Sequence, residues 1–554
     1  MHMKYIFCFC LVSLVLTLSV TKAEQSADLK DALLKSTLLQ ISDSAKGFGN
    51  SPEFCAPQVM RAPGSNEKFS LPSDLLNGIQ MFKTGIKSAE FNRETCAPFL
   101  KNIYTNLLRT PPEYFDQKKL KEDANAIVQE LFTTKLELRK RLRDLEGAGP
   151  VSDACISALR DIFRASLFMT EYITEQFIPG LGHDVAFEGS GPELLLNPEF
   201  GPKLELRSGD VLLSRGNAFV SGAIARIGDD DGNFSHAATV YVDPSTKKTY
   251  VVEAHIEVGS TITPLEKYLT DGKLRAVVFR QKDPVLAEKA SKTIFDRVKK
   301  ASASGKNVPY DFGMVLESRE KGKRGDEELF CSEIVYSAYK TASDGKLLLP
   351  KYPTGLHPKN NKFLKDIGVL ASETFAPSDM ELETRFEEVA EWRNFKKTQR
   401  ARMIDSVLTK TYEFMNEKNY ALKNTPEDML KRDMAYAMRH LPLFSNLVKD
   451  KFPQNMTRRA LGTMLALDKV AAPMLERLKQ ASDEQKIKTG YPFTAAQMGT
   501  YLDQLREKDY QTYLARQKYE EDVEAHKNDE SWYPPTKIPP ESLFHKRFGP
   551  GLGF

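Results

Sequence analysis

The hydrophobic period of the sequence changes twice along the chain, and this pattern limits the folds that it can adopt. Apolar residues follow helical spacing over residues 24–180, a strand pattern over residues 204–281, and a charged helical pattern from about residue 380 to 525. Helical and strand segments are therefore present in one chain but largely in separate stretches. We expect an α+β protein in which a mixed domain is flanked by N- and C-terminal helical domains.

The N-terminal stretch has an amphipathic helical pattern. Residues 147–150, Gly-Ala-Gly-Pro, predict the end of one helix, and Ser152 is a predicted N-cap for the next. The apolar residues on one face of the first helix are Ala124, Ile127, Val128, Leu131, Leu138, Leu142 and Leu145. A helical bundle that buries this face accounts for the pattern.

The middle of the chain contains short runs typical of strands. These runs are residues 210–214, 237–242, 250–254 and 274–280. The turn-forming residues 243–248 separate the second run from the third, which predicts a β-hairpin. Residues 284–301 and 330–340 are predicted helices, and the second begins beside Cys331.

The first 23 residues predict export. Lys4 precedes an apolar run over residues 5–20, and Thr21 and Ala23 place small residues before a cleavage point. This is the pattern of a secretory signal cleaved after Ala23, and an uncleaved membrane anchor is the alternative. Later in the chain no run approaches 18 apolar residues, so we expect no transmembrane segment in the mature protein and a periplasmic or extracellular location.

The composition limits which classes of partner molecule the chain is expected to bind. The 554 residues include 78 Lys and Arg against 75 Asp and Glu, and this near-balance does not favour a nucleic acid as partner. There is no Cys-x-x-Cys motif and no Cys/His cluster with zinc spacing, so we expect no metal and no cofactor. The pattern does not determine an oligomeric state.

The cysteines of an exported chain can form disulfides. Cys55 and Cys96 share the local sequence Cys-Ala-Pro, and we predict a bridge between them. Cys155 is the competing partner, and otherwise it is expected to be buried and unpaired in the helical bundle. Cys331 lies more than 170 residues further along the chain and requires a separate explanation.

Three short segments of the middle region carry residues suited to nucleophilic catalysis. His236 starts one predicted strand, Glu253 and His255 lie on the returning strand, and Cys331 lies at the start of a helix. A thiol with an ordinary pKa of about 8.5 supplies little thiolate at neutral pH. A helix N-terminus and an adjacent imidazole both lower that pKa, and a third group must then orient the imidazole.

The register of the hairpin favours a carboxylate as the third group. If the turn centres on residues 245–246, Ala238 faces Glu253 and His236 faces His255, with all four side chains on one face. Glu253 is then the diagonal neighbour of His236 and our first choice to orient it. His255 is the second choice, and a shift of one residue in register would remove the argument.

Five segments in this order resemble a known family. They are Gly209-Asp-Val-Leu-Leu, Ser235-His236-Ala-Ala-Thr-Val, Val252-Glu253-Ala, Pro309-Tyr310-Asp-Phe and Phe330-Cys331-Ser-Glu-Ile-Val-Tyr. Together they are similar to the permuted papain-like hydrolases of the NlpC type, the YaeF/YiiX/YebB group. The resemblance covers about residues 204–375, where His236 precedes Cys331 in the circularly permuted order.

The resemblance implies a thiol hydrolase that acts on an amide bond. Cys331 would be the nucleophile, His236 the general base and acid, and Glu253 the polar third member. Tyr310 and His255 are candidate substrate or oxyanion residues, and Tyr310 has packing in the core as its alternative. An amide-containing substrate is implied, with peptidoglycan stem peptides as the first candidate for an exported protein.

Two alternatives stay open. A lipid amide or ester hydrolase or an acyltransferase of the same fold is one, and a non-catalytic cell-envelope binding or scaffold protein is the other.

The predicted organisation is a signal peptide (1–23), a helical domain (24–180), a linker (181–203), the papain-like domain (204–375) and a helical C-terminal domain with a Pro-rich tail (376–554). Arg215 is interpreted as a surface residue.

Overall fold

The computed structural model describes most of the chain after residue 73. The described residues are 60–61, 68–69, 74–305, 307–316, 328–356, 361–423, 426–438, 456–529 and 531–551. They all belong to one compact unit, Val59–Phe554. The predicted signal peptide and Cys55 lie outside the described residues, so the cleavage and export predictions stay predictions.

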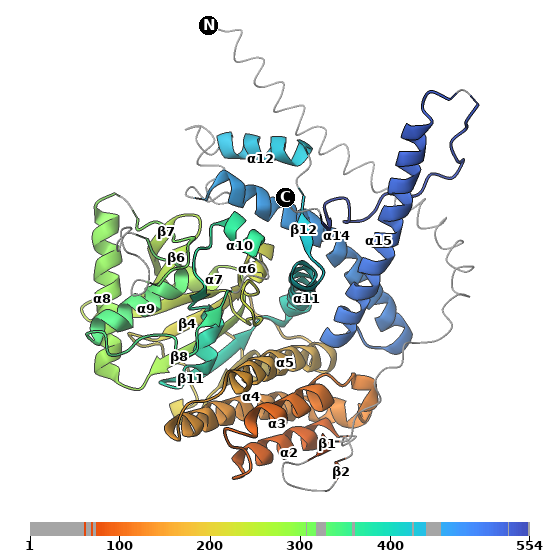
Figure 1. Ribbon diagram of the computed structural model, residues 1–554. Helices are drawn as coiled ribbons and strands as arrows, with labels where there is room; N and C mark the ends of the chain where they lie inside the picture. Colours follow the sequence, from red (N-terminus) through yellow and green to blue (C-terminus); the bar gives the residue numbers. More distant parts are fainter. Residues whose placement is uncertain are drawn as a thin grey trace. The chain divides into compact units, whose positions relative to one another are not determined.

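Seven of the described strands form one antiparallel sheet in the order β3-β11-β8-β4-β5-β6-β7 (Figure 1). The strands are β3 (Leu194–Leu196), β4 (Val211–Gly216), β5 (His236–Val242), β6 (Thr249–His255), β7 (Gly259–Pro264), β8 (Lys273–Gln281) and β11 (Phe386–Arg393). Nearly every residue of β4 and β8 is buried, as in strands that are covered on both faces. The prediction of a mixed helix and sheet protein is confirmed.

The hairpin between β5 and β6 has the predicted register. Ala238 pairs with Glu253 and Thr239 pairs with Val252. The Asp243 carboxylate accepts hydrogen bonds from the backbone N–H groups of Ser245 and Thr246, which closes the turn locally. Because side chains alternate between faces, this register places His236, Glu253 and His255 on the same face of the sheet.

Two helices cover one face of the sheet. α8 (Pro284–Ala303) and α9 (Cys331–Ala342) pack against each other and against β5 and β6 (Figure 1). The core between them contains apolar side chains from both layers, including Val252, Ile294 and Ile334. On the other face, Ala238 and Val251 join a second apolar cluster with Tyr268 of α7 (Leu265–Thr270).

Helices precede the sheet in the chain. They are α2 (Leu75–Lys87), α3 (Cys96–Ile103), the π-helix η2 (Tyr104–Leu108), the 3-10 helix η3 (Pro112–Tyr114), α4 (Gln117–Gly147) and α5 (Asp153–Phe177). All seven residues of the predicted apolar face are buried in α4. The Ser152 side chain accepts a hydrogen bond from the Cys155 N–H, so the predicted N-cap is confirmed.

The predicted bridge between Cys55 and Cys96 is wrong, because Cys96 is bonded to Cys155. Cys96 is the first residue of α3 and Cys155 lies in the first turn of α5, with 5.5 Å between their Cα atoms. Both side chains are fully buried where α3 packs on α5. Cys155 is therefore buried, as expected, but it is not unpaired.

Short elements connect the sheet to its surroundings. They are the 3-10 helices η4 (Gly191–Glu193), η5 (Pro198–Phe200) and η8 (Pro377–Leu382), the helices α6 (Phe219–Ile224) and α10 (Asn361–Ile367), and the paired strands β9 (Thr354–Gly355) and β10 (Glu373–Thr374). Another two-residue pair is formed by β1 (Met60–Arg61) and β2 (Lys68–Phe69).

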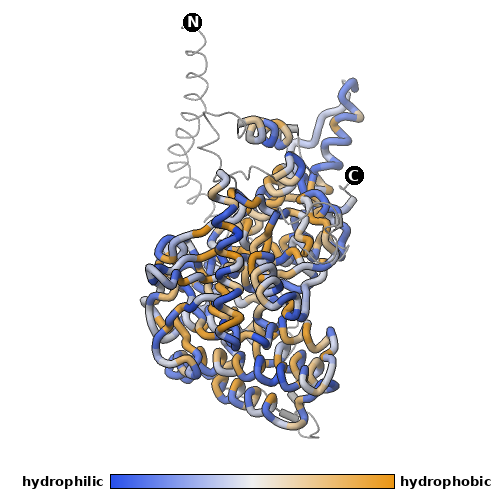
Figure 2. Tube along the Cα trace, turned by 90° about the vertical axis from the view of Figure 1, so that its left-hand side faces the viewer, coloured by the Kyte–Doolittle hydropathy of each residue, from blue (hydrophilic) through white to orange (hydrophobic). Residues whose placement is uncertain are grey.

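Helices also dominate after β11. They are α11 (Phe395–Glu417), α12 (Pro426–Met438), α14 (Arg458–Thr489) and α15 (Ala495–Ala525), and β12 (Tyr420–Leu422) pairs with β13 (Phe548–Pro550). Apolar segments gather where these elements meet, whereas the outer end of α15 is hydrophilic (Figure 2). Among the described helices, none has the length and apolar character needed to cross a membrane.

The sheet extends beyond the predicted papain-like domain on both sides. β3 lies within the predicted linker and β11 within the predicted C-terminal domain, yet both strands belong to the same sheet as β5 and β6. β11 pairs along its length with β8. The predicted domain boundaries stay predictions. β11 is a strand that the charged sequence pattern did not reveal.

Candidate active site

Adjacent elements of the sheet layer position the predicted site residues. His236 is the first residue of β5, and Glu253 and His255 lie at the end of β6. Cys331 is the first residue of α9, a helix that packs on β5 and β6. A thiol at this position lies at the positive end of the helix dipole, where backbone N–H groups have no partner within the helix.

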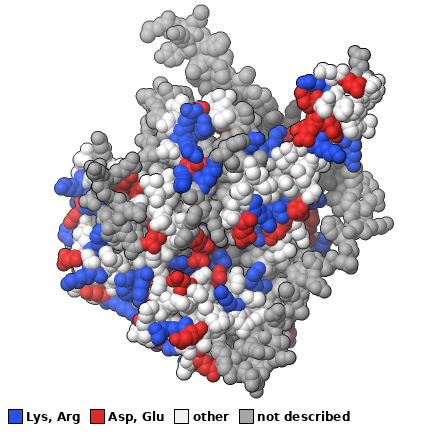
Figure 3. Space-filling view, in the orientation of Figure 1, with Lys and Arg blue, Asp and Glu red and all other residues white. Residues whose placement is uncertain are grey.

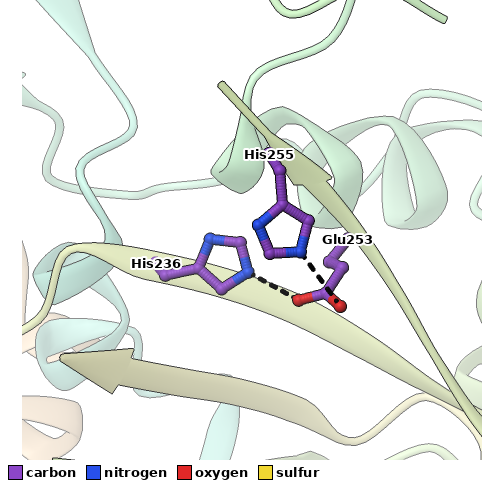
Figure 4. A group of neighbouring side chains, drawn as sticks. All are labelled: His236, Glu253 and His255. Atoms are coloured by element: carbon purple, nitrogen blue, oxygen red, sulfur yellow. Dashed lines mark hydrogen bonds and ion pairs between the residues drawn. The ribbon is translucent and has the colours of Figure 1, made fainter. Parts of the chain in front are cut away.

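Glu253 accepts hydrogen bonds from two imidazoles (Figure 4). The Nε2 atom of His236 lies 2.9 Å from Oε2, and the Nε2 atom of His255 lies 3.2 Å from Oε1. The two rings are stacked, with 5.2 Å between their centroids. Because an ionised carboxylate only accepts, each imidazole carries its proton on Nε2 in these contacts.

The thiol of Cys331 lies beside His236. The Sγ atom lies 3.9 Å from the Ser235 carbonyl oxygen, and the imidazole of His236 is near enough to act on the pKa of the thiol. Since Nε2 of His236 faces Glu253, its Nδ1 atom is the one left for the thiol. Within the described part of the chain, Cys331 is the cysteine that is not in a disulfide.

The electrostatics of these contacts favour a thiolate–imidazolium pair. Burial opposes ionisation of Cys331, but the hydrogen bond and charge of His236 outweigh it and lower the pKa of the thiol. Burial also opposes the charged form of His236, yet Cys331 and Glu253 together raise the pKa of His236 to about 9. Despite its own burial, Glu253 has a pKa held well below its usual range by hydrogen bonds from both imidazoles.

Tyr310 also lies at the thiol. Its hydroxyl shares a hydrogen bond with Cys331, and burial together with the charge of Cys331 raises the pKa of Tyr310 well above its ordinary value. The phenol therefore stays protonated and available as a donor at neutral pH. Its ring also packs near Phe312, with 5.2 Å between the centroids, so Tyr310 combines the two roles that the sequence left open.

Cys331 opens onto a narrow cavity of about 40 Å³. Two segments, residues 224–234 and 374–382, supply most of the cavity wall. Apolar side chains of this wall include Ile227, Phe234, Met314, Leu356, Phe375 and Leu382. The side chains of His236 and His255 are 20% and 32% exposed, whereas that of Glu253 is 3% exposed, so the imidazole side is the wetter side of the site.

The same side chains have the donor set of a metal site. One ligand atom from each of His236, Glu253 and His255 lies within 4.8 Å of the others. Two imidazoles and a carboxylate are a ligand set that Zn²⁺ accepts. In this arrangement the three groups already satisfy one another through hydrogen bonds, so a metal would have to replace both contacts to Glu253.

Comparison with known proteins identifies the segment that carries these residues. Residues 205–380 match the family model of permuted papain-like amidases, the YaeF/YiiX or C92 family. The match covers a segment of the chain and includes His236, Glu253, Tyr310 and Cys331. No curated protein and no solved structure matches the chain. The resemblance to the YaeF/YiiX group is confirmed for this segment, and the match supports an amidase-type hydrolase.

The structure brings together every predicted catalytic residue, but the C92 segment alone does not build the site. β11 and the end of η8 lie outside the match, and this end of η8 supplies Glu381 and Leu382 to the cavity beside Cys331. Sequence reasoning did not find the cavity wall, because its residues are spread over segments without a common period. The signal for His255 as a second donor to Glu253 was present in the hairpin register.

Proposed function

We propose that the chain is an exported thiol hydrolase that cleaves amide bonds, with Cys331 as nucleophile. The observation that carries this proposal is the contact of His236 with both Cys331 and Glu253, which supports a thiolate beside an imidazolium. The match of residues 205–380 to permuted papain-like amidases supports the reaction class. The predicted signal peptide supports export.

In the first half of the proposed reaction, the Cys331 thiolate attacks the carbonyl carbon of the amide. Negative charge moves to the carbonyl oxygen, where the backbone N–H of Cys331 and the Tyr310 hydroxyl are the proposed donors. His236 then transfers its Nδ1 proton to the amide nitrogen. The carbon–nitrogen bond breaks, the amine leaves, and the acyl group stays on Cys331 as a thioester.

The second half returns the enzyme to its starting state. His236, now neutral, takes a proton from a water molecule, and the resulting hydroxide attacks the thioester carbonyl. The carbon–sulfur bond breaks, the carboxylic acid is released, and the thiolate forms again beside a protonated His236. Glu253 accepts the Nε2–H throughout, so it holds the ring and offsets its charge.

The substrate class follows from two different observations. The predicted export favours peptidoglycan stem peptides, which contain amide bonds outside the cytoplasm. The apolar cavity wall favours a second candidate, an acyl amide or ester whose chain would lie against Phe234, Phe375 and Leu382. In the second case the same thioester could pass its acyl group to an acceptor other than water.

The test is a substrate panel with the purified full chain after signal removal. Peptidoglycan fragments, N-acyl amides and acyl esters are incubated with the protein, and the products are identified by mass spectrometry. We expect cleavage of at least one class by the wild type and none by Cys331→Ser, which is nearly isosteric but lacks the thiolate. Ser343→Ala, outside the site, is the matched control and should retain activity.

Three results would contradict the proposal. Equal cleavage by Cys331→Ser would exclude the thiol as nucleophile. A wild type that cleaves nothing in the panel and whose Cys331 does not react with a thiol-directed activity probe would favour the scaffold alternative. Loss of activity in a chelator would point instead to metal chemistry at His236, Glu253 and His255, whereas a thiol mechanism keeps its activity without metal.

A further inference from the structure

A second, larger cavity of about 320 Å³ lies away from the catalytic thiol. Its wall is formed by α5 on one side and by α11 and the start of α15 on the other, and α11 packs against both helices (Figure 1). Cys331, His236 and Tyr310 do not line this cavity. A volume of about 300–1,000 Å³ is usual for small-molecule sites.

The cavity wall carries more cations than carboxylates. The cations are Arg109, Arg164, Arg226, Arg402 and Lys410, and the carboxylates are Asp231, Glu413 and Asp503. Most of the cations have partners: Arg164 pairs with Asp231 at 2.9 Å, and Lys410 pairs with Asp503 at 2.8 Å. On the molecular face shown in Figure 3, cations and carboxylates are interspersed.

Arg226 is a buried cation of this wall that shares its carboxylate partner with other arginines. Only 1% of the residue is exposed, and its ion pair is with Asp405, at 3.1 Å from Nη1 to Oδ1. Asp405 also pairs with Arg215 at 2.9 Å and with Arg275 at 3.0 Å, so one carboxylate is shared by three guanidinium groups. Among the described residues, Nε, Nη1 and Nη2 of Arg226 have no hydrogen-bond acceptor.

Burying the Arg226 guanidinium in this way costs free energy of folding unless another group supplies hydrogen-bond acceptors to it. A buried guanidinium without hydrogen-bond acceptors loses the hydration that it would have in water. Arg226 is also one of the residues that line the cavity, so an anion bound there would lie next to this side chain. A carboxylate or phosphate oxygen would supply both the missing acceptors and a negative charge.

The other side of the cavity is apolar. Phe168, Met169 and Ile173 of α5 line it together with Leu108 and Phe115. We propose that this cavity binds a small amphiphilic anion, with its carboxylate or phosphate head on Arg226 and a short apolar chain against α5. The proposal does not depend on the reaction at Cys331, because no residue of the proposed catalytic group contributes to it.

The first test measures binding to the wild-type full chain by titration calorimetry. The probes are octanoate, octyl phosphate, octanol, octylamine and inorganic phosphate. We expect the two octyl anions to bind about tenfold or more tightly than octanol, as lost hydrogen bonds to a charged group imply, and octylamine not to bind. The comparison of octanoate with octyl phosphate identifies the preferred head group. The comparison of octyl phosphate with inorganic phosphate shows how much the octyl chain contributes to binding.

The second test uses variants with the same probes. Arg226→Gln should weaken binding of the octyl anions about tenfold or more and leave octanol unchanged. Ala165→Phe fills the cavity from α5 without changing a charge, and it should abolish binding of both anions. Lys300→Gln removes one exposed positive charge at the end of α8 and is the matched control, with binding as in the wild type.

Two results would overturn the proposal. One is wild-type binding of octyl anions that is no tighter than binding of octanol. The other is wild-type affinity in a folded Arg226→Gln variant. If Arg226→Gln or Ala165→Phe does not fold, as judged by circular dichroism, the probe series on the wild type decides alone. Amide hydrolysis at Cys331 is measured separately and does not enter either outcome.

Discussion

At the scale of single residues, the charge of Glu253 controls how strongly His236 holds its proton. The hydrogen bond from His236 to Glu253 contributes to a His236 pKa of about 9, and deprotonation above this pH removes the acid that the leaving amine needs. In the proposed mechanism, activity should therefore fall as the pH rises through about 9. At the acidic limit, activity should require ionisation of Cys331, whose pKa is lowered.

Glu253→Gln tests this coupling. The amide oxygen can still accept the Nε2–H but does not offset the imidazolium charge, so the pKa of His236 should fall and the alkaline limb of the kcat/KM profile should move to lower pH. We expect a partial loss of activity, smaller than that of Cys331→Ser. Glu266→Gln is the control: it also removes one negative charge, but from an exposed residue of α7, and it should leave the pH profile unchanged. Full activity of Glu253→Gln alongside inactivity of His255→Ala would assign the third position to His255.

Local sequence patterns were sufficient for much of the site. The turn at Asp243 and the alternation of two strands predict the register, which places Glu253 beside His236. The position of Cys331 at a helix start follows from the same kind of local pattern. Arg215, by contrast, was expected at the surface and is buried, because its partner Asp405 lies 190 residues away in the chain and no local pattern reveals it.

At the scale of elements, the disulfide fixes the N-terminal helices. Cys96 and Cys155 close a loop with a sequence separation of 59 between α3 and α5. On the chain-entropy estimate, closing a loop of this length stabilises the folded state by about 4 kcal/mol. Cys96→Ala together with Cys155→Ala should lower the free energy of unfolding by about 2–4 kcal/mol in a denaturant titration.

The control for this prediction is reduction of the wild type, which should lower the stability to a similar extent. A double variant as stable as the oxidised wild type would contradict the assigned bridge. Non-reducing peptide mapping provides an independent check, since a cross-linked peptide that contains Cys331 would contradict both the bridge and the free catalytic thiol.

The strand β11 shows where prediction of elements fails. Its sequence contains Glu388 and Glu391, charges that are typical of a solvated helix rather than of a central strand. In the structure both carboxylates are buried and pair with Lys135 of α4, at 3.3 Å for Glu388. A strand with buried charges is identified only when its partner is known, and that partner lies more than 250 residues earlier.

At the scale of the whole molecule, a buried ionic network connects the helices to the sheet. Asp405 of α11 pairs with Arg215 of β4 and Arg275 of β8, and Arg275 also pairs with Glu171 of α5. Burial alone would raise the pKa of Asp405, but the surrounding guanidinium groups hold it well below its usual range. These residues come from elements on both sides of the predicted domain boundaries, so the helices and the sheet share one ionic core.

Removing this carboxylate should destabilise the whole unit. Asp405→Asn leaves three buried guanidinium groups without their shared anion, and breaking a buried ion pair in this way costs about 3–5 kcal/mol. The measurement is the free energy of unfolding from a denaturant titration. Asp296→Asn, an exposed residue paired with Lys292, is the matched control with an expected change within about 0.5 kcal/mol. Equal stability of Asp405→Asn and the wild type would contradict the network.

The central claim is that Cys331 is a thiolate paired with His236, and its pKa tests this most directly. The ultraviolet absorbance of the thiolate is recorded against pH for the wild type, with Cys331→Ser subtracted so that every other titrating group cancels. We predict a Cys331 pKa clearly below the ordinary value of about 8.5, and a rise towards or above that value in His236→Ala. A wild-type pKa near about 8.5 that does not change in His236→Ala would contradict the account.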